Sequence, residues 1–412
     1  MADPLRTRKT YFYELWRAGT AGILETAGST FLLTIAVRAF SAGAFAKAAV
    51  AGAGSVGLLL SPVVVAFVTN RRWRTSQAAS RILAVGTVSF LVAAAAPVLP
   101  VFVVCSILGM ASSASIIPLL TQMYQDNYPE KERGRRFSRT VMVRIAMAAL
   151  FSKVAGDALS GELREGFRWL LVVFGGALGF ASFCLARCPT EPIHQDGGAH
   201  PLRALRFARD DKVFRLTLIC WMLMGFGNLM MLPLRIEYLA NEKYHPGQIL
   251  SVDMIALLTG VIPNLARLVL SPVWGYLFDR VNFFALRVTL NLGFAIGILA
   301  FFTSGSFWGL IAGGVVFGIS NAGGDVAWSL WVTKLAPPDR VADYMSVHTF
   351  LTGVRGVLAP AIGFALVSHV PLGWMAGISC TLILAASALL LPEMKAGRKA
   401  RPASALVEEI SE

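Results

Sequence analysis

The chain has 412 residues, of which 56% are hydrophobic and only 15% are charged, and its mean hydropathy is +0.63. A soluble protein of this length needs far more charge to cover its surface, so the composition excludes an ordinary soluble protein. The net charge of +13 does not indicate nucleic-acid binding, because the basic residues are spread over many loops and not gathered on one face.

Apolar segments of roughly 20 residues, long enough to cross the hydrocarbon core of a membrane, recur along almost the whole chain. Several contain Gly, Pro or a single charge, which membrane helices tolerate because neighbouring helices satisfy the backbone. The sequence therefore predicts an all-α polytopic membrane protein. Its twelve predicted transmembrane helices lie at about residues 18–40, 43–69, 82–98, 100–124, 139–160, 168–187, 213–238, 251–278, 288–304, 307–333, 344–368 and 371–391.

Basic residues predict the orientation of these helices. They precede helix 1, follow helices 2 and 4, and recur at 187–215 and in the tail, whereas the loops after helices 3, 9 and 11 contain no Lys or Arg. The positive-inside rule places both termini and the central loop in the cytoplasm, so we expect a multi-pass protein of the cell inner membrane. Because no cleavage site with small residues follows the first apolar run, we expect helix 1 to act as its own insertion signal.

One long polar break, from Cys188 to about Lys212, divides the chain into two sets of six helices. Its turn-forming residues followed by basic ones predict a linker with a short amphipathic surface helix. The expected organisation is an N-terminal six-helix bundle, a cytoplasmic central linker, a C-terminal six-helix bundle and a cytoplasmic tail. Their respective ranges are 1–187, 188–212, 213–391 and 392–412.

Ionisable and polar residues inside the predicted helices are the main functional signal, because placing them in lipid costs several kcal/mol unless they face a cavity or a partner. Asn321, Asp325 and Trp328, for example, fall at i, i+4 and i+7 and so share one helix face. The candidates for substrate binding or ion coupling are Glu25, Ser29, Asn228, Arg267, Asn321, Asp325, Trp328, His348 and Arg355.

Several of these candidates have a structural alternative. Glu25 and Asp325 line a cavity or take part in buried pairing, and Arg267 and Arg355 hold a substrate carboxylate or neutralise those two acids. The i,i+4 residues Lys153 and Asp157 are expected to satisfy each other. Arg144, close to the cytoplasmic end of predicted helix 5, is expected to reach the membrane surface and is assigned no role.

Gly52-Ala-Gly-Ser-Val-Gly57 formally matches a dinucleotide-binding fingerprint, but it lies inside an apolar helix without the strand and acidic residue that such a site requires. These glycines, like Gly314 and Gly318, indicate close packing of helices. The five cysteines have no zinc-binding spacing, so we expect free thiols and no metal. We expect no cofactor and no enzymatic activity, since no phosphate loop, zinc motif or nucleophile elbow occurs.

The sequence also repeats itself at half its length. LSPV occurs at residues 60–63 and again at 270–273, and at a similar offset Gly109 and Pro129-Glu130 correspond to Gly318 and Pro338-Asp339. Parallel repeats of six helices are the pattern of the major facilitator superfamily. The segment Gly275-Tyr-Leu-Phe-Asp279-Arg280 resembles that superfamily's motif between helices 8 and 9.

This resemblance implies that helices 1, 4, 7 and 10 line a central cavity and that a cytoplasmic clasp holds the two bundles together. The residues implied for this clasp are Gly275, Asp279, Arg280, Glu130, Arg133 and Arg340. The first-half copy of the motif departs from the pattern, because Val65 stands for its Gly and Thr69 for its Asp. Helix 5 also lacks the Gly-Pro signature of many drug and proton antiporters.

The expected function is that of a secondary active transporter, which moves a small polar or amphiphilic solute by alternating access and is coupled to protons through Glu25 or Asp325. The expected partners are the small-molecule substrate, a proton as coupling ion and the lipid bilayer; we expect a monomer and no nucleic acid. The alternative is a membrane receptor or assembly factor that keeps the fold without transport. The departure of the first motif favours this alternative, whereas the polar helix faces and the intact second motif favour transport.

Overall fold

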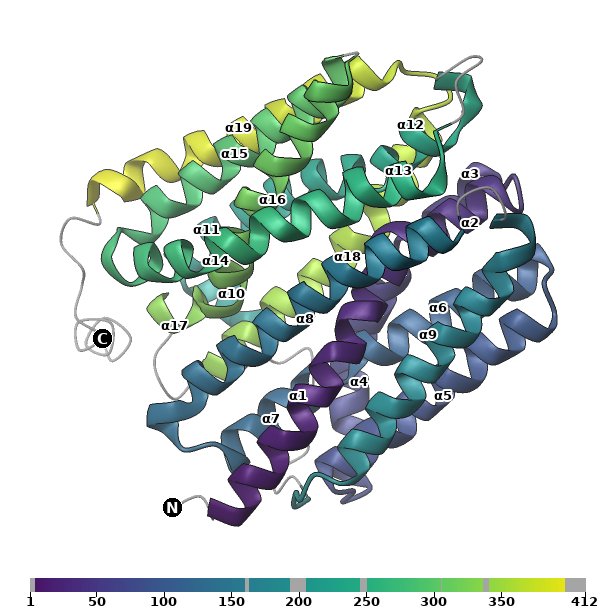
Figure 1. The fold of residues 1–412 in the computed structure, drawn as a ribbon. Helices are drawn as coiled ribbons and strands as arrows, with labels where there is room; N and C mark the ends of the chain where they lie inside the picture. Colours follow the sequence, from purple (N-terminus) through teal and green to yellow (C-terminus); the bar gives the residue numbers. More distant parts are fainter. Residues whose placement is uncertain are drawn as a thin grey trace.

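The computed structural model is almost entirely helical and describes residues 4–159, 163–192, 205–244, 250–304, 306–335 and 341–396 (Figure 1). The N-terminal group of helices consists of α1 (Pro4–Thr26), η1 (Ala27–Phe31), α2 (Leu32–Arg38), α3 (Ala44–Ala51), α4 (Ala53–Asn70), α5 (Thr75–Ala95), α6 (Leu99–Ser115), α7 (Ile117–Asn127), α8 (Glu130–Ala158) and α9 (Leu163–Ala186).

The C-terminal group begins with α10 (Leu205–Asp210), which lies where the sequence predicts a short helix in the linker. It continues with α11 (Lys212–Met231), α12 (Leu234–Ala240), η3 (Glu242–Tyr244), α13 (Val252–Ala256), η4 (Leu257–Val261), α14 (Ile262–Arg280), α15 (Phe283–Thr303), α16 (Phe307–Leu330), α17 (Val332–Leu335), α18 (Val341–Leu366) and α19 (Leu372–Ala396).

The described residues contain a helix for each of the twelve predicted segments. Ten helices are long and apolar enough to cross a membrane, and the pair α3 and α4, bent by 52°, makes an eleventh. The remaining one, α8, is 29 residues long and packs against α1 and α14, but its charged residues make its composition less apolar than that of the others. The predicted all-α polytopic fold is thus confirmed.

Two helices begin earlier than predicted. The first helical stretch starts at Pro4 and runs 35 residues to Arg38, and α8 starts at Glu130, nine residues before the predicted start. The additional turns of α8 consist largely of Arg, Lys and Glu, which are good helix formers and extend a helix beyond its apolar part, and those of α1 mix the same residue types with aromatic ones. This shift of α8 places Arg144 at the middle of the helix.

Close packing explains the glycines that the sequence analysis assigned to helix contacts. A Cβ atom on Gly57 of α4 would lie 2.3 Å from the carbonyl oxygen of Ala111 in α6. A Cβ on Gly318 of α16 would lie equally close to the carbonyl oxygen of Pro263 in α14. Any larger side chain would force these helix pairs apart, so the prediction of close helix packing is confirmed at these two positions.

The two groups meet along α8 and α14 and along α18 with α3 and α4. Two π-helical segments, η1 and η4, also lie side by side across this boundary, where the hydroxyls of Thr30 and Thr259 are 3.2 Å apart. Single π-helical turns occur frequently at functional sites. This irregular backbone therefore marks the boundary between the two groups as the place to look for one.

Further contacts between the groups lie at one end of the molecule. We call the end where α1 begins and α19 ends the near end, and the opposite end, where α2 ends and α3 begins, the far end (Figure 1). At the far end, Lys47 Nζ lies 2.6 Å from Glu237 Oε1, and Arg38 donates to the carbonyl oxygens of Ala240 and Leu250. These contacts close the far end between the two groups.

Candidate functional site

A cluster of four charged side chains lies between the two helix groups. Arg267 of α14 donates one hydrogen bond to Glu25 Oε1 of α1 and another, 2.5 Å long, to Asp325 Oδ2 of α16. Arg144 of α8 lies 3.1 Å from the second oxygen of Glu25. We call these four residues the ion cluster.

The ion cluster is electrically balanced, since it contains two carboxylates and two guanidinium groups. The side chain of Arg267 is only 6% exposed, so its charge needs the two acids beside it. The side chains of Glu25 and Asp325 retain 27% and 33% exposure, respectively. Each acid is thus paired with arginine and still partly accessible, as an acid that exchanges a proton or contacts a solute must be.

Chain topology explains how residues so distant in sequence meet. Glu25 and Arg267 are 242 positions apart, and Arg267 and Asp325 are 58 apart. Glu25 and Arg144 belong to the N-terminal group, whereas Arg267 and Asp325 belong to the C-terminal group. The pair between Glu25 and Arg267 therefore joins the two groups directly.

The sequence left two roles open for Arg267, and in the structure its guanidinium pairs with both Glu25 and Asp325, which is the arrangement of the structural alternative. A role of Arg267 in holding a substrate stays a prediction. The expectation for Arg144 was wrong: the side chain pairs with Glu25 and does not extend to the membrane surface, because α8 begins early and places it at mid-helix. Lys153 and Asp157 do satisfy each other, with 2.6 Å between Nζ and Oδ1.

The other predicted residues lie in several places. Ser29 is exposed within η1, one turn from Glu25, and Asn321 and Trp328 are partly exposed on α16 on either side of Asp325. His348 and Arg355, on α18, are buried within the C-terminal group and do not reach the ion cluster.

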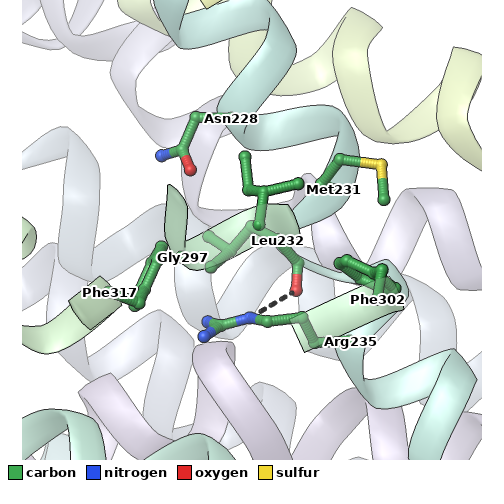
Figure 2. Close-up of a pocket in the computed structure, with 8 residues that line it drawn as sticks. Asn228, Met231, Leu232, Arg235, Gly297, Phe302 and Phe317 are labelled. Carbon is green, nitrogen blue, oxygen red and sulfur yellow. Dashed lines mark hydrogen bonds between the residues drawn. The ribbon is translucent and has the colours of Figure 1, made fainter. Parts of the chain in front are cut away.

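Asn228 lines a separate narrow pocket in the C-terminal group (Figure 2). In this pocket Arg235 donates to the Leu232 carbonyl oxygen at 3.4 Å, and its guanidinium lies 3.9 Å from the centre of the Phe317 ring. The rest of the lining is apolar, and none of the ion-cluster residues contributes to it.

The predicted cytoplasmic clasp falls mostly outside the described residues. This is true of Arg340 and of the side chains of Glu130, Arg133 and Asp279. Gly275 lies in α14 with open space beside it, and Arg280 contacts Tyr276 of its own helix, with its guanidinium carbon 4.0 Å from the ring centre. The clasp therefore stays a prediction.

Sequence reasoning missed the polar contacts at the far end. Lys47 and Glu237 form a buried ion pair between α3 and α12, and Asn241 donates to the same Glu237 oxygen at 2.8 Å. A signal was present, since each of the two is a charged residue inside an apolar run, and such residues are costly in lipid unless paired. The signal was overlooked because both lie close to predicted helix ends.

Known proteins resemble this chain in part of its sequence and in its fold. Residues 236–409 match the family model described as Major Facilitator Superfamily. No curated protein matches the chain in a sequence search. Among solved structures, a mutant of the nucleoside transporter NupG superposes with a TM-score of 0.74 at 13% sequence identity, covering 93% of this chain and 99% of the other.

Two further solved structures, of transporters with other solutes, share the fold. The D-xylose-proton symporter gives a TM-score of 0.69 at 17% identity, covering 94% of this chain and 96% of its own. A POT family transporter in complex with a thioalcohol conjugated peptide gives 0.68 at 13%, covering 96% of both chains. These identities show the fold alone and leave the solute open. The second half of the chain thus matches the Major Facilitator Superfamily model, and nearly the whole chain has the fold of these solved transporters.

Proposed function

We propose that this protein is a secondary active transporter that moves a small polar or amphiphilic solute by alternating access of its two helix groups. The observation that carries the proposal is the ion pair between Glu25 of α1 and Arg267 of α14. This pair joins the two groups directly, so it must break whenever they part at this point. A reaction that breaks the pair reversibly would drive the transport cycle.

Protonation of Glu25 is the reaction that fits best. A neutral Glu25 no longer needs Arg267, while Arg267 keeps Asp325, which belongs to the same helix group and moves with it. A proton can therefore replace the pair between the groups without leaving an unpaired carboxylate in the membrane. We assign proton coupling to Glu25. We assign to Asp325 the role of holding Arg267 in position. Two structures that share the fold are titled as transporters of small polar solutes, one of them as a proton symporter.

The remaining parts of the proposal concern the two ends of the molecule. The far-end contacts of Lys47 with Glu237, and of Arg38 with two carbonyl oxygens, would form the gate that is closed here. The clasp implied by Asp279 would close the near end in the other state. With the termini in the cytoplasm, the far end faces outward and the structure corresponds to a state closed to the outside.

A receptor or assembly factor that keeps the fold without transport is the second candidate. One observation favours it: the family match covers only residues 236–409, and the first half departs from the gate motif at Val65 and Thr69. Such a protein would bind its ligand without exchanging between two states. The two candidates therefore differ in whether a bound solute crosses the membrane.

The test combines solute binding with uptake. The purified full-length protein is screened against metabolites by thermal shift, and each stabilising solute is then offered in radiolabelled form to proteoliposomes with an imposed proton gradient. We expect saturable accumulation that collapses when a protonophore is added. A solute that binds tightly and is neither accumulated nor exchanged would support the receptor and contradict the transporter.

A further inference from the structure

The C-terminal group contains a second concentration of positive charge, separate from the ion cluster. Trp221 of α11 is in contact with two arginines: the guanidinium carbon of Arg287 of α15 is 3.6 Å from the centre of its ring, and that of Arg355 of α18 is 5.7 Å away. The imidazole of His348 lies tilted against the same indole, with 5.1 Å between the ring centres. We call Trp221, Arg287, His348 and Arg355 the Trp221 cluster.

Both arginines are deeply buried, with Arg287 2% and Arg355 5% exposed. Arg287 Nη2 donates only to the sulfur of Met224, at 2.8 Å, and Arg355 Nη1 donates to the carbonyl oxygen of Trp221. Arg287 Nη1 and Arg355 Nε have no hydrogen-bond partner among the residues that the structure describes, and neither does His348 Nε2.

No described carboxylate forms an ion pair with either arginine of the Trp221 cluster. Two buried arginines elsewhere in the same molecule do have acids: Arg17 pairs with Glu14 at 2.5 Å, and Arg267 pairs with two carboxylates. Arg235 is also buried without an ion pair to a described residue, but it lies on the Phe317 ring as a single cation, whereas the Trp221 cluster places two such guanidinium groups side by side.

The aromatic rings do not make up for this deficit. A desolvated cation–π contact contributes roughly 2 kcal/mol, and a thioether sulfur is a weak acceptor. Burying a guanidinium without a counter-charge costs several kcal/mol, and the repulsion between two neighbouring cations adds to that cost. An anion between Arg287 and Arg355 would remove both penalties and would use the free N–H groups of both side chains.

The backbone is shaped around one of these guanidinium groups. A Cβ on Gly225, one turn after Trp221, would lie 2.2 Å from Arg355 Nη1. Only glycine leaves room for the Arg355 head group at this point on α11. A flexible surface arginine would need no such space, so the position of Arg355 is built into the packing of α11 against α18.

The cluster adjoins the region that a solute would reach from the ion cluster. Trp328, partly exposed and one turn beyond Asp325 on α16, contacts His348 with 5.5 Å between the ring centres, and Trp331 meets the same imidazole edge to face at 5.1 Å. Trp328 therefore connects the accessible side of Asp325 with His348 of the Trp221 cluster. The three indoles around His348 favour an anion with a flat or apolar body.

We infer that the Trp221 cluster is an anion-binding site for the carboxylate of the transported solute, with Arg287 and Arg355 as its donors. This inference rests on the proposed transport function and specifies its substrate class: a small organic acid with an apolar or aromatic body. A carboxylate presents two oxygens to the planar guanidinium groups, which a single halide ion cannot do.

The test measures equilibrium binding and requires no transport. The melting temperature of the full-length protein in nanodiscs is recorded against sodium benzoate, sodium acetate, sodium chloride, sodium phosphate and neutral benzamide. We expect benzoate to raise the melting temperature in a saturable manner, acetate to act more weakly, and benzamide, which has the same shape without the charge, to have no effect. The substitutions Arg287→Gln and Arg355→Gln should each weaken benzoate binding at least about tenfold, since each removes a charged hydrogen bond.

A matched control separates loss of the site from loss of the fold. Removing an uncompensated buried charge does not destabilise a protein as breaking an ion pair does, so both Gln variants should melt no lower than the parent without ligand. Arg235→Gln removes another buried arginine of the same helix group, located on Phe317, and should leave the benzoate effect unchanged.

Several results would overturn the inference: no stabilisation by either carboxylate, an equal effect of benzamide, or a benzoate effect that survives in both Arg287→Gln and Arg355→Gln. Stabilisation by chloride or phosphate with no further effect of benzoate would mean a resident inorganic ion and would contradict a carboxylate solute. None of these results affects the transport proposal, which is judged by uptake. Conversely, a carboxylate that binds here but never crosses the membrane would contradict transport and leave the site standing.

Discussion

Arg267 is the residue on which the proposed mechanism depends most. It is almost fully buried, it serves two carboxylates, and one of them lies on the opposite helix group. Glu25 is the member of the ion cluster with a partner on each side of the boundary, Arg144 and Arg267. Charge changes at these positions should therefore separate coupling from binding.

Replacing Glu25 with Gln keeps the shape of the side chain and removes its charge. We expect accumulation of solute against a gradient to be lost, because the proton no longer has a group to occupy, while exchange of labelled for unlabelled solute continues. Asp325→Asn is the matched comparison and should weaken solute binding more than coupling, since Arg267 then loses its partner within the same group. Both activities are measured in proteoliposomes. If both variants accumulate solute as the parent does, the carboxylates are structural.

Arg267→Gln should lower the melting temperature sharply, because it leaves two carboxylates facing each other with only Arg144 nearby. Breaking a fully buried pair costs about 3–5 kcal/mol, and the partial exposure of Glu25 and Asp325 reduces this figure here. The triple variant with Glu25→Gln and Asp325→Asn added should recover most of the loss. A triple variant as unstable as the single one would show that Arg267 acts through packing and not through charge.

At the scale of elements, an ion pair between Lys47 and Glu237 connects α3 and α12 at the far end of the molecule. Glu237 is 3% exposed at its side chain and accepts from both Lys47 and Asn241. Lys47→Met leaves this acid buried without a counter-charge, which favours any state in which water reaches it. The proposed outer gate should therefore open more often.

The opening of this gate can be followed at Thr259, which contacts Thr30 across the boundary and is 5% exposed. We expect a cysteine at position 259 to react faster with a maleimide when Lys47→Met is present. The exchanged pair Lys47→Glu with Glu237→Lys should return the rate towards that of the parent. Equal rates in all three proteins would remove the pair from the gate.

The helices could be predicted from sequence where their formation depends on residues close together in the chain. Apolar length identifies a spanning segment, but helix propensity carried α8 nine residues beyond its apolar part, and this displaced Arg144 from helix end to helix centre. Helical periodicity placed His348 and Arg355 on one face of α18, and they do share a cluster. It could not show that this face points into the C-terminal group, because the direction of a face depends on the neighbouring helices.

At the scale of the whole molecule, the orientation in the membrane can be tested by labelling each end from one side. Cysteines introduced at Arg71 and Lys243 lie on exposed residues at the near and far ends, respectively. We expect labelling of position 71, together with positions 197 and 399, from the cytoplasm only, and of position 243 from outside only. Burial raises the pKa of the Cys188 thiol, at the near end, to about 12, so this native cysteine should stay silent towards the reagent. External labelling of position 197 would overturn the assignment of two six-helix bundles.

The sequence could not predict which residues pair within the ion cluster, because pairing depends on the tertiary structure. Glu25, Arg267 and Asp325 each stood out as charges in apolar segments, yet pairing depends on how α1, α14 and α16 meet in space. The free-energy cost of placing a charge in lipid is relieved by any suitable partner, so this cost identifies the charged residues without identifying which of them pair. The separation of 242 residues between Glu25 and Arg267 is closed only by the assembly of both helix groups.

The most direct test of alternating access measures distances at both ends of the molecule. Spin labels at positions 45 and 243 report on the far end, and labels at 71 and 281 on the near end, all of them on exposed residues. Double electron–electron resonance should show two populations at each end, and Glu25→Gln should shift them in opposite directions, because it releases the pair with Arg267. A single distance distribution at both ends, unchanged by Glu25→Gln and by bound solute, would contradict the transporter.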